Sequence, residues 1–306
     1  MEIAAAGGHN VIMIGPPGAG KTMLAKRMSG ILPPLALQEA LETTKIHSVA
    51  GRLSANDTLM TSRPFRSPHH TISDVALVGG GTNPQPGEIS LAHNGVLFLD
   101  VLPEFKRTVL EVMRQPLEDR VITISRAKST VDYPASFMLI SSMNPCPCGY
   151  YNHPEKDCLC PPGMVQKYLN KISGPLLDRI DLHVEVTPVS FDELASKTKG
   201  ESSADIRERV MEARDTQEQR YSNAKGVHAN AQISTKQLQK YCLLNTESQQ
   251  MLKMAMEKLN LSARAYDRIL KVSRTIADLA KSESITSEHI AEAIQYRSLD
   301  REGWAG

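Results

Sequence analysis

The chain has 306 residues, of which 41% are hydrophobic and 23% charged, and its formal net charge is +1. This is the composition of an ordinary globular protein, and the length allows one large domain or a core with a smaller second domain. With so little net charge, any nucleic-acid binding must come from a local basic surface, such as a channel formed on assembly. No apolar run approaches the roughly 20 residues that span a bilayer, and the first residues lack the pattern of a signal peptide. We therefore expect no membrane association and a cytoplasmic location.

The most informative stretch is residues 11–22, where four apolar residues run directly into G-x-x-x-x-G-K-T, followed by a helical pattern. Glycines let successive backbone N–H groups converge on phosphate oxygens, and the helix N-terminus favours negative charge. Lys21 is then expected at the β- and γ-phosphates and Thr22 on Mg²⁺. The sequence predicts an ATP-binding loop rather than a mere Gly/Pro-rich turn, made of Gly15, Pro16, Pro17, Gly18, Ala19, Gly20, Lys21, Thr22 and Met23.

Two further stretches precede the next clear strand. Residues 44–49 predict a second strand, and residues 51–81, rich in proline and glycine, predict a long irregular insert. The adjacent His69 and His70 are a weak hint of a metal site, because neighbouring residues on a strand point to opposite faces.

Residues 94–100 form an apolar run closed by a carboxylate, which is typical of a buried central parallel strand. An acid at the C-terminal end of such a strand lies beside the phosphate loop and can hold Mg²⁺ through water. Asp100 is therefore predicted to hold the magnesium ion together with Thr22. Residues 137–141 predict another buried strand, which leads to Asn144; its amide either orients water near the γ-phosphate or caps a turn.

Residues 117–135 alternate in polarity and predict a hairpin with Arg126 and Lys128 near its tip. The two cations either have a binding role or belong to a solvated turn, since exposed lysine and arginine are common.

Four of the five cysteines lie between residues 146 and 160 in the pattern C-x-C-x₉-C-x-C. In a reducing compartment such clustering favours a metal over disulfides. Four thiolates complete a tetrahedral Zn²⁺ site, and a loop so rich in proline has little other source of order. The sequence predicts structural zinc on Cys146, Cys148, Cys158 and Cys160, with unliganded thiols as the alternative. A catalytic zinc is disfavoured because four protein ligands leave no open position.

The pattern turns helical after a last predicted core strand at residues 182–186. One helix is predicted over residues 262–279, with Ser262 as its N-cap and an apolar face that excludes most of its cations. A final helix is predicted from about residue 286 to 296. We therefore predict an α/β core with a parallel sheet over residues 1–190 and an all-helical domain over residues 191–306.

Together these stretches resemble the AAA+ ATPases of the magnesium-chelatase and MCM-helicase branch. In particular, they resemble the bacterial magnesium-chelatase-like competence protein family, ComM, also called YifB. The stretches that carry it span the chain: residues 7–10, 63–70, 86–93, 143–149, 177–181, 262–266 and 296–301. The resemblance implies a P-loop AAA+ core followed by a helical lid.

The resemblance also implies roles for single residues. Asn144 is similar to sensor 1, Arg179 to the arginine finger offered to a neighbouring subunit's nucleotide, and Arg264 to sensor 2 in the lid. A finger that acts between subunits implies a homo-oligomeric ring, a hexamer; from the residues alone, Arg179 could equally pair with Asp178 or Asp181.

The predicted hairpin is similar to the pore-lining hairpin of related helicases. This makes Arg126 and Lys128 candidate DNA contacts, and the implied activity is branch migration of DNA in transformation.

One position departs from the family pattern. Where the family has Asp-Glu after the apolar strand, this chain has Asp100 followed by Val101. Loss of a water-polarising carboxylate predicts intact nucleotide binding with hydrolysis slowed by roughly 10²–10⁴-fold. Glu104 follows Pro103 beyond the strand end, so we do not expect it to substitute. The alternatives are a non-hydrolysing nucleotide-binding regulatory or assembly module and a magnesium-chelatase-type ATPase subunit.

Overall fold

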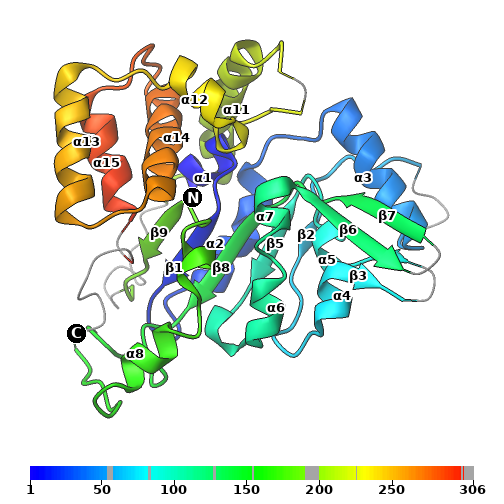
Figure 1. Ribbon diagram of the computed structural model, residues 1–306, viewed down its shortest axis with the longest axis horizontal. Coiled ribbons are helices and arrows are strands. Elements are labelled where there is room, and N and C mark those ends of the chain that lie inside the picture. Colours follow the sequence, from blue (N-terminus) through cyan, green and yellow to red (C-terminus); the bar gives the residue numbers. More distant parts are fainter. Residues whose placement is uncertain are drawn as a thin grey trace. The chain divides into compact units, whose positions relative to one another are not determined.

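The structure is a computed structural model of the 306-residue chain. It describes residues 1–53, 58–81, 84–126, 129–153, 155–189, 200–224, 226–297 and 299, without the side chains of Arg126 and Ser129. The chain forms two compact units (Figure 1). One comprises Met1–Pro33 and Ile180–Gly306, and the other comprises Pro34–Arg179.

The first unit contains a pair of parallel strands. β1 (Val11–Ile14) pairs with β9 (Leu182–Glu185), and all four residues of β1 are buried. The remaining elements among the described residues of this unit are helical: α1 (Glu2–Gly7), α2 (Lys21–Ile31), α11 (Ser203–Arg220), η2 (Asn230–Gln232), α12 (Thr235–Tyr241), α13 (Thr246–Lys258), α14 (Ala263–Leu279) and α15 (Ser287–Gln295).

Helix α14 is the central helix of this unit and contacts α1, α11, α12 and α15. The Ser262 hydroxyl caps it by accepting the Ala265 N–H at 3.2 Å, as predicted. Its apolar stripe, which includes Ile269 and Val272, is buried. Arg274, expected largely off that face, is buried as well, because Asp278 pairs with it at 3.0 Å.

The second unit contains three parallel strands in the order β2 (Phe65–Arg66), β5 (Val96–Leu99) and β8 (Met138–Met143). Every residue of β5 and β8 is buried. Two antiparallel pairs lie outside these strands: β3 (Gly79–Gly80) with β4 (Gln85–Pro86), and β6 (Val121–Arg126) with β7 (Ser129–Pro134). The helices are α3 (Leu37–Val49), α4 (Asp74–Val78), α5 (Glu88–Leu91), η1 (Leu102–Glu104), α6 (Arg107–Glu111), α7 (Pro116–Asp119), α8 (Met164–Leu169) and α9 (Gly174–Leu177).

The prediction of a strand over residues 44–49 is wrong, because these residues form the second half of α3. The Thr43 and Thr44 hydroxyls donate to the carbonyls of Glu39 and Ala40 one turn earlier, which satisfies polar groups that disfavour helices elsewhere. A tertiary contact from His47 Nε2 to the Leu91 carbonyl, at 2.9 Å, holds the helix end. Local propensity is a weak prior, and packing overrides it here.

The parallel strands and their flanking helices confirm the predicted α/β class. Among the described residues beyond 200, the only β pairing is one isolated bridge, between Leu244 and Ile285. The boundary at residue 190 stays a prediction, since the two compact units divide the chain at other positions. No described helix combines the length and the apolar character needed to cross a bilayer.

Candidate nucleotide site

The loop between β1 and α2 has the backbone shape that the sequence predicts. A Cβ on Gly15 would lie 2.1 Å from the Val186 carbonyl oxygen, so only glycine fits there. Gly18 and Gly20 have φ of 82° and 85°, a left-handed conformation that glycine adopts without steric cost. Helix α2 begins directly after Gly20, so its first N–H groups lie at the end of this loop.

Lys21 is held above this loop by the loop's own carbonyls. Its ammonium group is buried and donates to the oxygens of Gly15 at 2.7 Å and Pro16 at 2.9 Å. These contacts keep the charge where a phosphate oxygen can take over the N–H groups. Thr22 is half-buried in the first turn of α2, and Met23 beside it is exposed.

Asp100 lies at the end of β5 and is fixed by a serine of the neighbouring strand. The Ser142 hydroxyl of β8 donates to Asp100 Oδ1 and accepts the Val101 N–H at 3.1 Å. The sequence interpretation missed Ser142; its signal is a pair of serines, Ser141 and Ser142, in a strand whose other residues are apolar. Val101 has φ 54° and ψ 58°, which is a genuine outlier for a β-branched residue.

Glu104, the nearest acidic residue after Val101, lies beside Lys171 of the same unit. It ends the short helix η1, and its carboxylate lies 3.8 Å from the Lys171 ammonium. This contact is consistent with our expectation that Glu104 does not replace a carboxylate at position 101.

Asn144 follows β8 directly and is half-buried. Tyr168 of α8 packs against its backbone. Burial raises the pKa of the Tyr168 hydroxyl above its ordinary value, against a hydrogen bond from the Asn144 backbone that lowers it. The sequence interpretation gave no role to Tyr168.

Arg179 follows α9, and only 7% of its side chain is exposed. Its Nη1 donates to the Pro175 carbonyl at 2.6 Å, and its Nη2 pairs with the carboxylate of Glu118 on α7. The sequence alternatives for Arg179 were its neighbours Asp178 and Asp181, so this partner, 61 residues earlier, was not predicted. Arg264 lies exposed in the first turn of α14.

Asp181 belongs to a buried network within the first unit. Its carboxylate accepts the Asn10 N–H at 2.8 Å and lies 3.1 Å from Arg268 of α14 and 3.6 Å from His9 Nδ1. Burial alone would raise the pKa of Asp181, but the Arg268 charge and these hydrogen bonds hold it well below its usual range. The network joins the residues before β1 to the helix that carries Arg264.

The four predicted cysteine ligands converge. Their sulfur atoms all lie within 4.8 Å of one another, with Cys146 Sγ 3.3 Å from Cys148 Sγ and 3.7 Å from Cys158 Sγ. Cys146 is buried, and the other three are partly exposed. Among the described residues, no other group of three or more such side chains could hold a metal ion, and His69 instead contacts the Thr71 hydroxyl at 2.9 Å.

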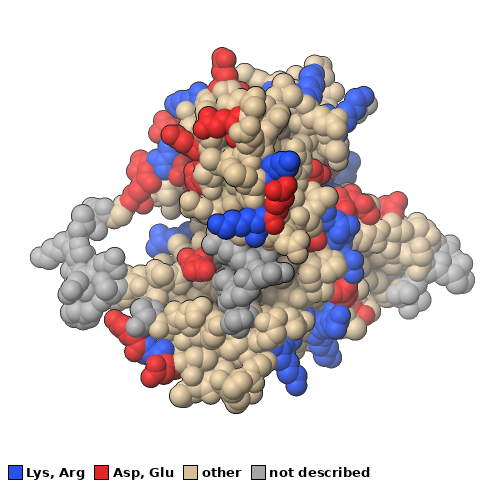
Figure 2. Space-filling view, turned by 60° about the vertical axis from the view of Figure 1, so that its left-hand side comes forward, with Lys and Arg blue, Asp and Glu red and all other residues tan. Residues whose placement is uncertain are grey.

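The predicted hairpin is present as β6 and β7, paired from Val121 with Pro134 to Arg126 with Ser129. Lys128 and the side chain of Arg126 lie outside the described residues. On the face shown in Figure 2, basic and acidic side chains are interspersed, in keeping with the small net charge.

Two family models match the chain. The model of magnesium chelatase subunit ChlI matches residues 1–194, and the model of the C-terminal part of that subunit matches residues 200–297.

Several curated proteins are similar over almost the whole chain. The uncharacterized protein YifB of Escherichia coli and the competence protein ComM of Haemophilus influenzae are each 48% identical to it over 98% of this chain and 58% of their own length. The chloroplastic magnesium-chelatase subunit ChlI of Oryza sativa is 22% identical over 93% of this chain and 67% of its own length. The chain therefore spans less than two thirds of the length of YifB and ComM.

Proposed function

We infer the function of this chain from one premise: it belongs to the magnesium chelatase ChlI family, whose members are AAA+ ATPases. We propose that it binds Mg·ATP, assembles into a homo-oligomeric hexameric ring in the cytoplasm and uses ATP to move on DNA. Because Val101 follows Asp100 where the family resemblance implies a glutamate, we propose that its own hydrolysis is slow.

The observation that carries ATP binding is the loop between β1 and α2. Gly15, Gly18 and Gly20 give it the required backbone, and two loop carbonyls hold Lys21 above it. A phosphate placed there meets converging N–H groups, a buried ammonium and a helix N-terminus. We assign residues 15–23 to the nucleotide and Thr22 with Asp100 to Mg²⁺.

The remaining catalytic assignments concern the γ-phosphate. We assign Asn144 to orienting the attacking water, and Arg264 and Arg179 to stabilising charge on the phosphates, Arg179 acting on the nucleotide of a neighbouring subunit. A guanidinium suits this task because it keeps its charge at any working pH.

The deciding experiment is steady-state ATP turnover of the chain and of Val101→Glu, at concentrations that permit assembly, with and without DNA. We expect the glutamate variant to turn over ATP roughly 10²–10⁴-fold faster, because it regains a general base. A Val101→Gln variant is the matched control, since it has the same shape without the charge, and it should stay slow.

The outcomes separate the candidates. Equal turnover by the chain and by Val101→Glu would show that another group positions the water. Mg·ATP binding with no turnover in either protein would favour a non-hydrolysing assembly module, which Val101 makes the second candidate. Turnover that requires a porphyrin partner and ignores DNA would favour a magnesium-chelatase-type subunit.

For DNA, we propose contacts from Arg126 and Lys128 at the end of the β6–β7 hairpin. The support is the presence of the hairpin together with the 48% identity to a competence protein. Replacing both cations with alanine should weaken DNA binding and reduce its salt dependence by about two phosphate contacts. Unchanged binding and an unchanged salt slope would exclude the hairpin as the contact.

We also propose a structural zinc ion on the four clustered cysteines. Tetrahedral Zn²⁺ with Zn–S bonds of about 2.3 Å needs sulfurs about 3.8 Å apart, and the distance from Cys148 Sγ to Cys158 Sγ is 3.6 Å. Zinc here would close an irregular loop that leaves β8 just after Asn144.

Elemental analysis should give one zinc per chain. Cys158→Ser should lose it, while Cys242→Ser, which changes a buried cysteine outside the cluster, should retain it. If the purified protein contains no metal and a chelator leaves its thermal stability unchanged, the zinc proposal is wrong.

A further inference from the structure

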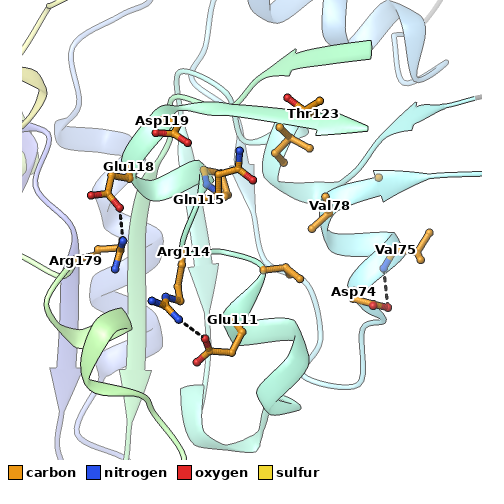
Figure 3. A pocket seen from close by; sticks show the side chains of 14 residues that line it. Asp74, Val75, Val78, Glu111, Arg114, Gln115, Glu118, Asp119, Thr123 and Arg179 are labelled. Carbon is orange, nitrogen blue, oxygen red and sulfur yellow. Dashed lines mark hydrogen bonds and ion pairs between the residues drawn. The ribbon is translucent and has the colours of Figure 1, made fainter. Parts of the chain in front are cut away.

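The pair formed by Arg179 and Glu118 lies in the wall of a pocket of about 620 Å³ in the second unit. Figure 3 shows the two side chains pointing toward each other across this wall. Besides α7 and Arg179, the pocket is lined by α4, α6 and the start of β6. Both Arg179 and the beginning of the hairpin therefore border the same space.

We propose that Glu118 is a positioning residue that keeps the Arg179 guanidinium from binding phosphate, and that the β6–β7 hairpin controls this contact. The proposal rests on the proposed function, in which Arg179 reaches the nucleotide of a neighbouring subunit. In addition, the proposal means that DNA bound at the hairpin regulates whether Arg179 can act on that nucleotide.

The electrostatic argument is a competition for one guanidinium. While Glu118 accepts from Nη2 and the Pro175 carbonyl accepts from Nη1, the Arg179 side chain is 7% exposed and a carboxylate balances its charge. Because a carboxylate and a phosphate compete for the same Nη2 group, release of Glu118 makes that group available to a phosphate.

The carboxylate is the more exposed partner of the pair. The Glu118 side chain is 51% exposed, so water can solvate it as soon as the pair separates. Arg179, which is nearly enclosed, then borders the pocket without the charge of Glu118 beside it. Because one partner is exposed and the other is buried, we regard the contact as a reversible ion pair, and we call it the latch.

The chain itself links the latch to the hairpin. Helix α7 ends at Asp119, Arg120 adopts a left-handed φ of 56°, and β6 starts at the next residue. The Arg120 carbonyl accepts the Ala135 N–H at 2.8 Å, which closes the base of the hairpin. Only two residues separate Glu118 from β6, so a displacement of the hairpin is carried to the carboxylate.

The pocket supplies a matched control. Glu111 of α6 lines the same pocket and pairs with Arg114 at 2.7 Å (Figure 3). Glu111→Gln removes the same charge from the same space as Glu118→Gln, but it leaves the Arg179 pair in place. Comparing the two variants separates the latch from a general change of pocket charge.

The experiment measures two quantities for the natural chain and for Glu118→Gln, Glu118→Asp, Glu111→Gln and Arg179→Ala. The first is ATP turnover with and without DNA, measured also in the Val101→Glu background. The second is the protein concentration for half-assembly with a slowly hydrolysed ATP analogue, obtained by sedimentation. The second quantity needs no hydrolysis.

We expect Glu118→Gln to raise DNA-independent turnover by about two- to fivefold, the range for loss of a partly exposed ion pair. DNA stimulation should shrink toward none, and the half-assembly concentration should fall by a similar factor. Glu118→Asp should keep DNA stimulation, and Glu111→Gln should behave like the natural chain. Combining Glu118→Gln with Arg179→Ala should return every value to that of Arg179→Ala.

Two results would overturn the latch alone. If Glu118→Gln lowers turnover and assembly as Arg179→Ala does, the carboxylate supports the finger rather than restraining it. If DNA stimulation in Glu118→Gln equals that of the natural chain, the hairpin does not act through Glu118. A third result reaches further: if Arg179→Ala changes neither assembly nor turnover, the proposed finger fails, and the latch proposal fails with it.

Discussion

Strands β1 and β5 have the same length and the same burial, but the segments that follow them differ. Both have four residues, and all of these are buried. After β1 the left-handed positions are taken by Gly18 and Gly20, whereas after β5 the left-handed position is Val101, with φ 54°. Both segments lead to residues that we assign to Mg·ATP.

The difference shows two ways of fixing a functional loop. Glycine enters the left-handed region without steric cost, so the segment after β1 takes its shape from local sequence. A valine there costs roughly 1–2 kcal/mol, and the shape persists because Ser142 of the neighbouring strand binds both Val101 and Asp100. One loop is fixed locally, and the other is fixed by a tertiary contact.

Among the variants that test this comparison, Lys21→Ala should have the largest effect. Lys21→Ala removes the buried ammonium that two loop carbonyls hold in place. Affinity for Mg·ATP should fall by about 100-fold, the loss of a charge-assisted contact to phosphate. Calorimetric titration measures this. Lys26→Ala, which changes an exposed lysine of the same helix, should bind as the natural chain does.

Ser142→Ala tests the tertiary contact after β5. It removes the hydroxyl that the Val101 N–H and Asp100 share, which should lower the free energy of unfolding by about 1–3 kcal/mol. Ser90→Ala is the control, because the buried Ser90 hydroxyl has no hydrogen-bond partner within the described structure. Denaturant unfolding that gave the same loss for both variants would contradict the assignment.

Acid should act on the residues that lead into β1. His9 is fully buried, and burial lowers its pKa although Asp181 opposes the shift. Below pH 6.5, about the pKa of histidine in the unfolded chain, the unfolded chain binds a proton at His9 that the folded chain does not bind. Stability should therefore fall as the pH drops below about 6.5, by up to about 1.4 kcal/mol per pH unit for this group.

The measurement is the unfolding free energy at several pH values for the natural chain and for His9→Gln. The variant should show a flatter dependence by up to one proton. An equal slope in both proteins would mean that His9 is already protonated in the folded state.

The smallest effect is expected for Val101→Gly. It relieves the left-handed strain but adds the backbone entropy of glycine, about 0.5–1 kcal/mol, so the net change should be within about 1 kcal/mol of zero. Val112→Gly is the matched control, because Val112 is 37% exposed and has an ordinary φ of −68°. The control should lose about 1 kcal/mol more, and equal losses would argue against strain at position 101.

The parts of the fold that the sequence predicted correctly have a strong periodic or apolar signal. The helix predicted over residues 262–279 combined a serine cap with a repeating apolar face. Strands β1 and β5 are continuous apolar runs, and β8 begins with one, Met138 to Ile140. Residues 44–49 had only a short β-type composition, and contacts within α3 and from His47 outweighed it. Short signals are the ones that tertiary packing reverses.

The candidate site divides in the same way. The loop residues, Asp100 and the four cysteines could be predicted from the sequence, because residues close together in the chain form each of these motifs. Ser142, Tyr168 and Glu118 could not, since each acts on a residue that lies far from it in the chain or on another element.

The sequence by itself determined the phosphate-binding loop, because glycine conformations and a helix start are local properties that neighbouring residues settle. It also determined that four thiols would crowd into one short loop. Only the tertiary structure decided which carboxylate faces Arg179 and which hydroxyl holds Asp100. Those pairings join residues 61 and 42 positions apart, and a contact of that kind exists only after the strands and helices between its partners have packed.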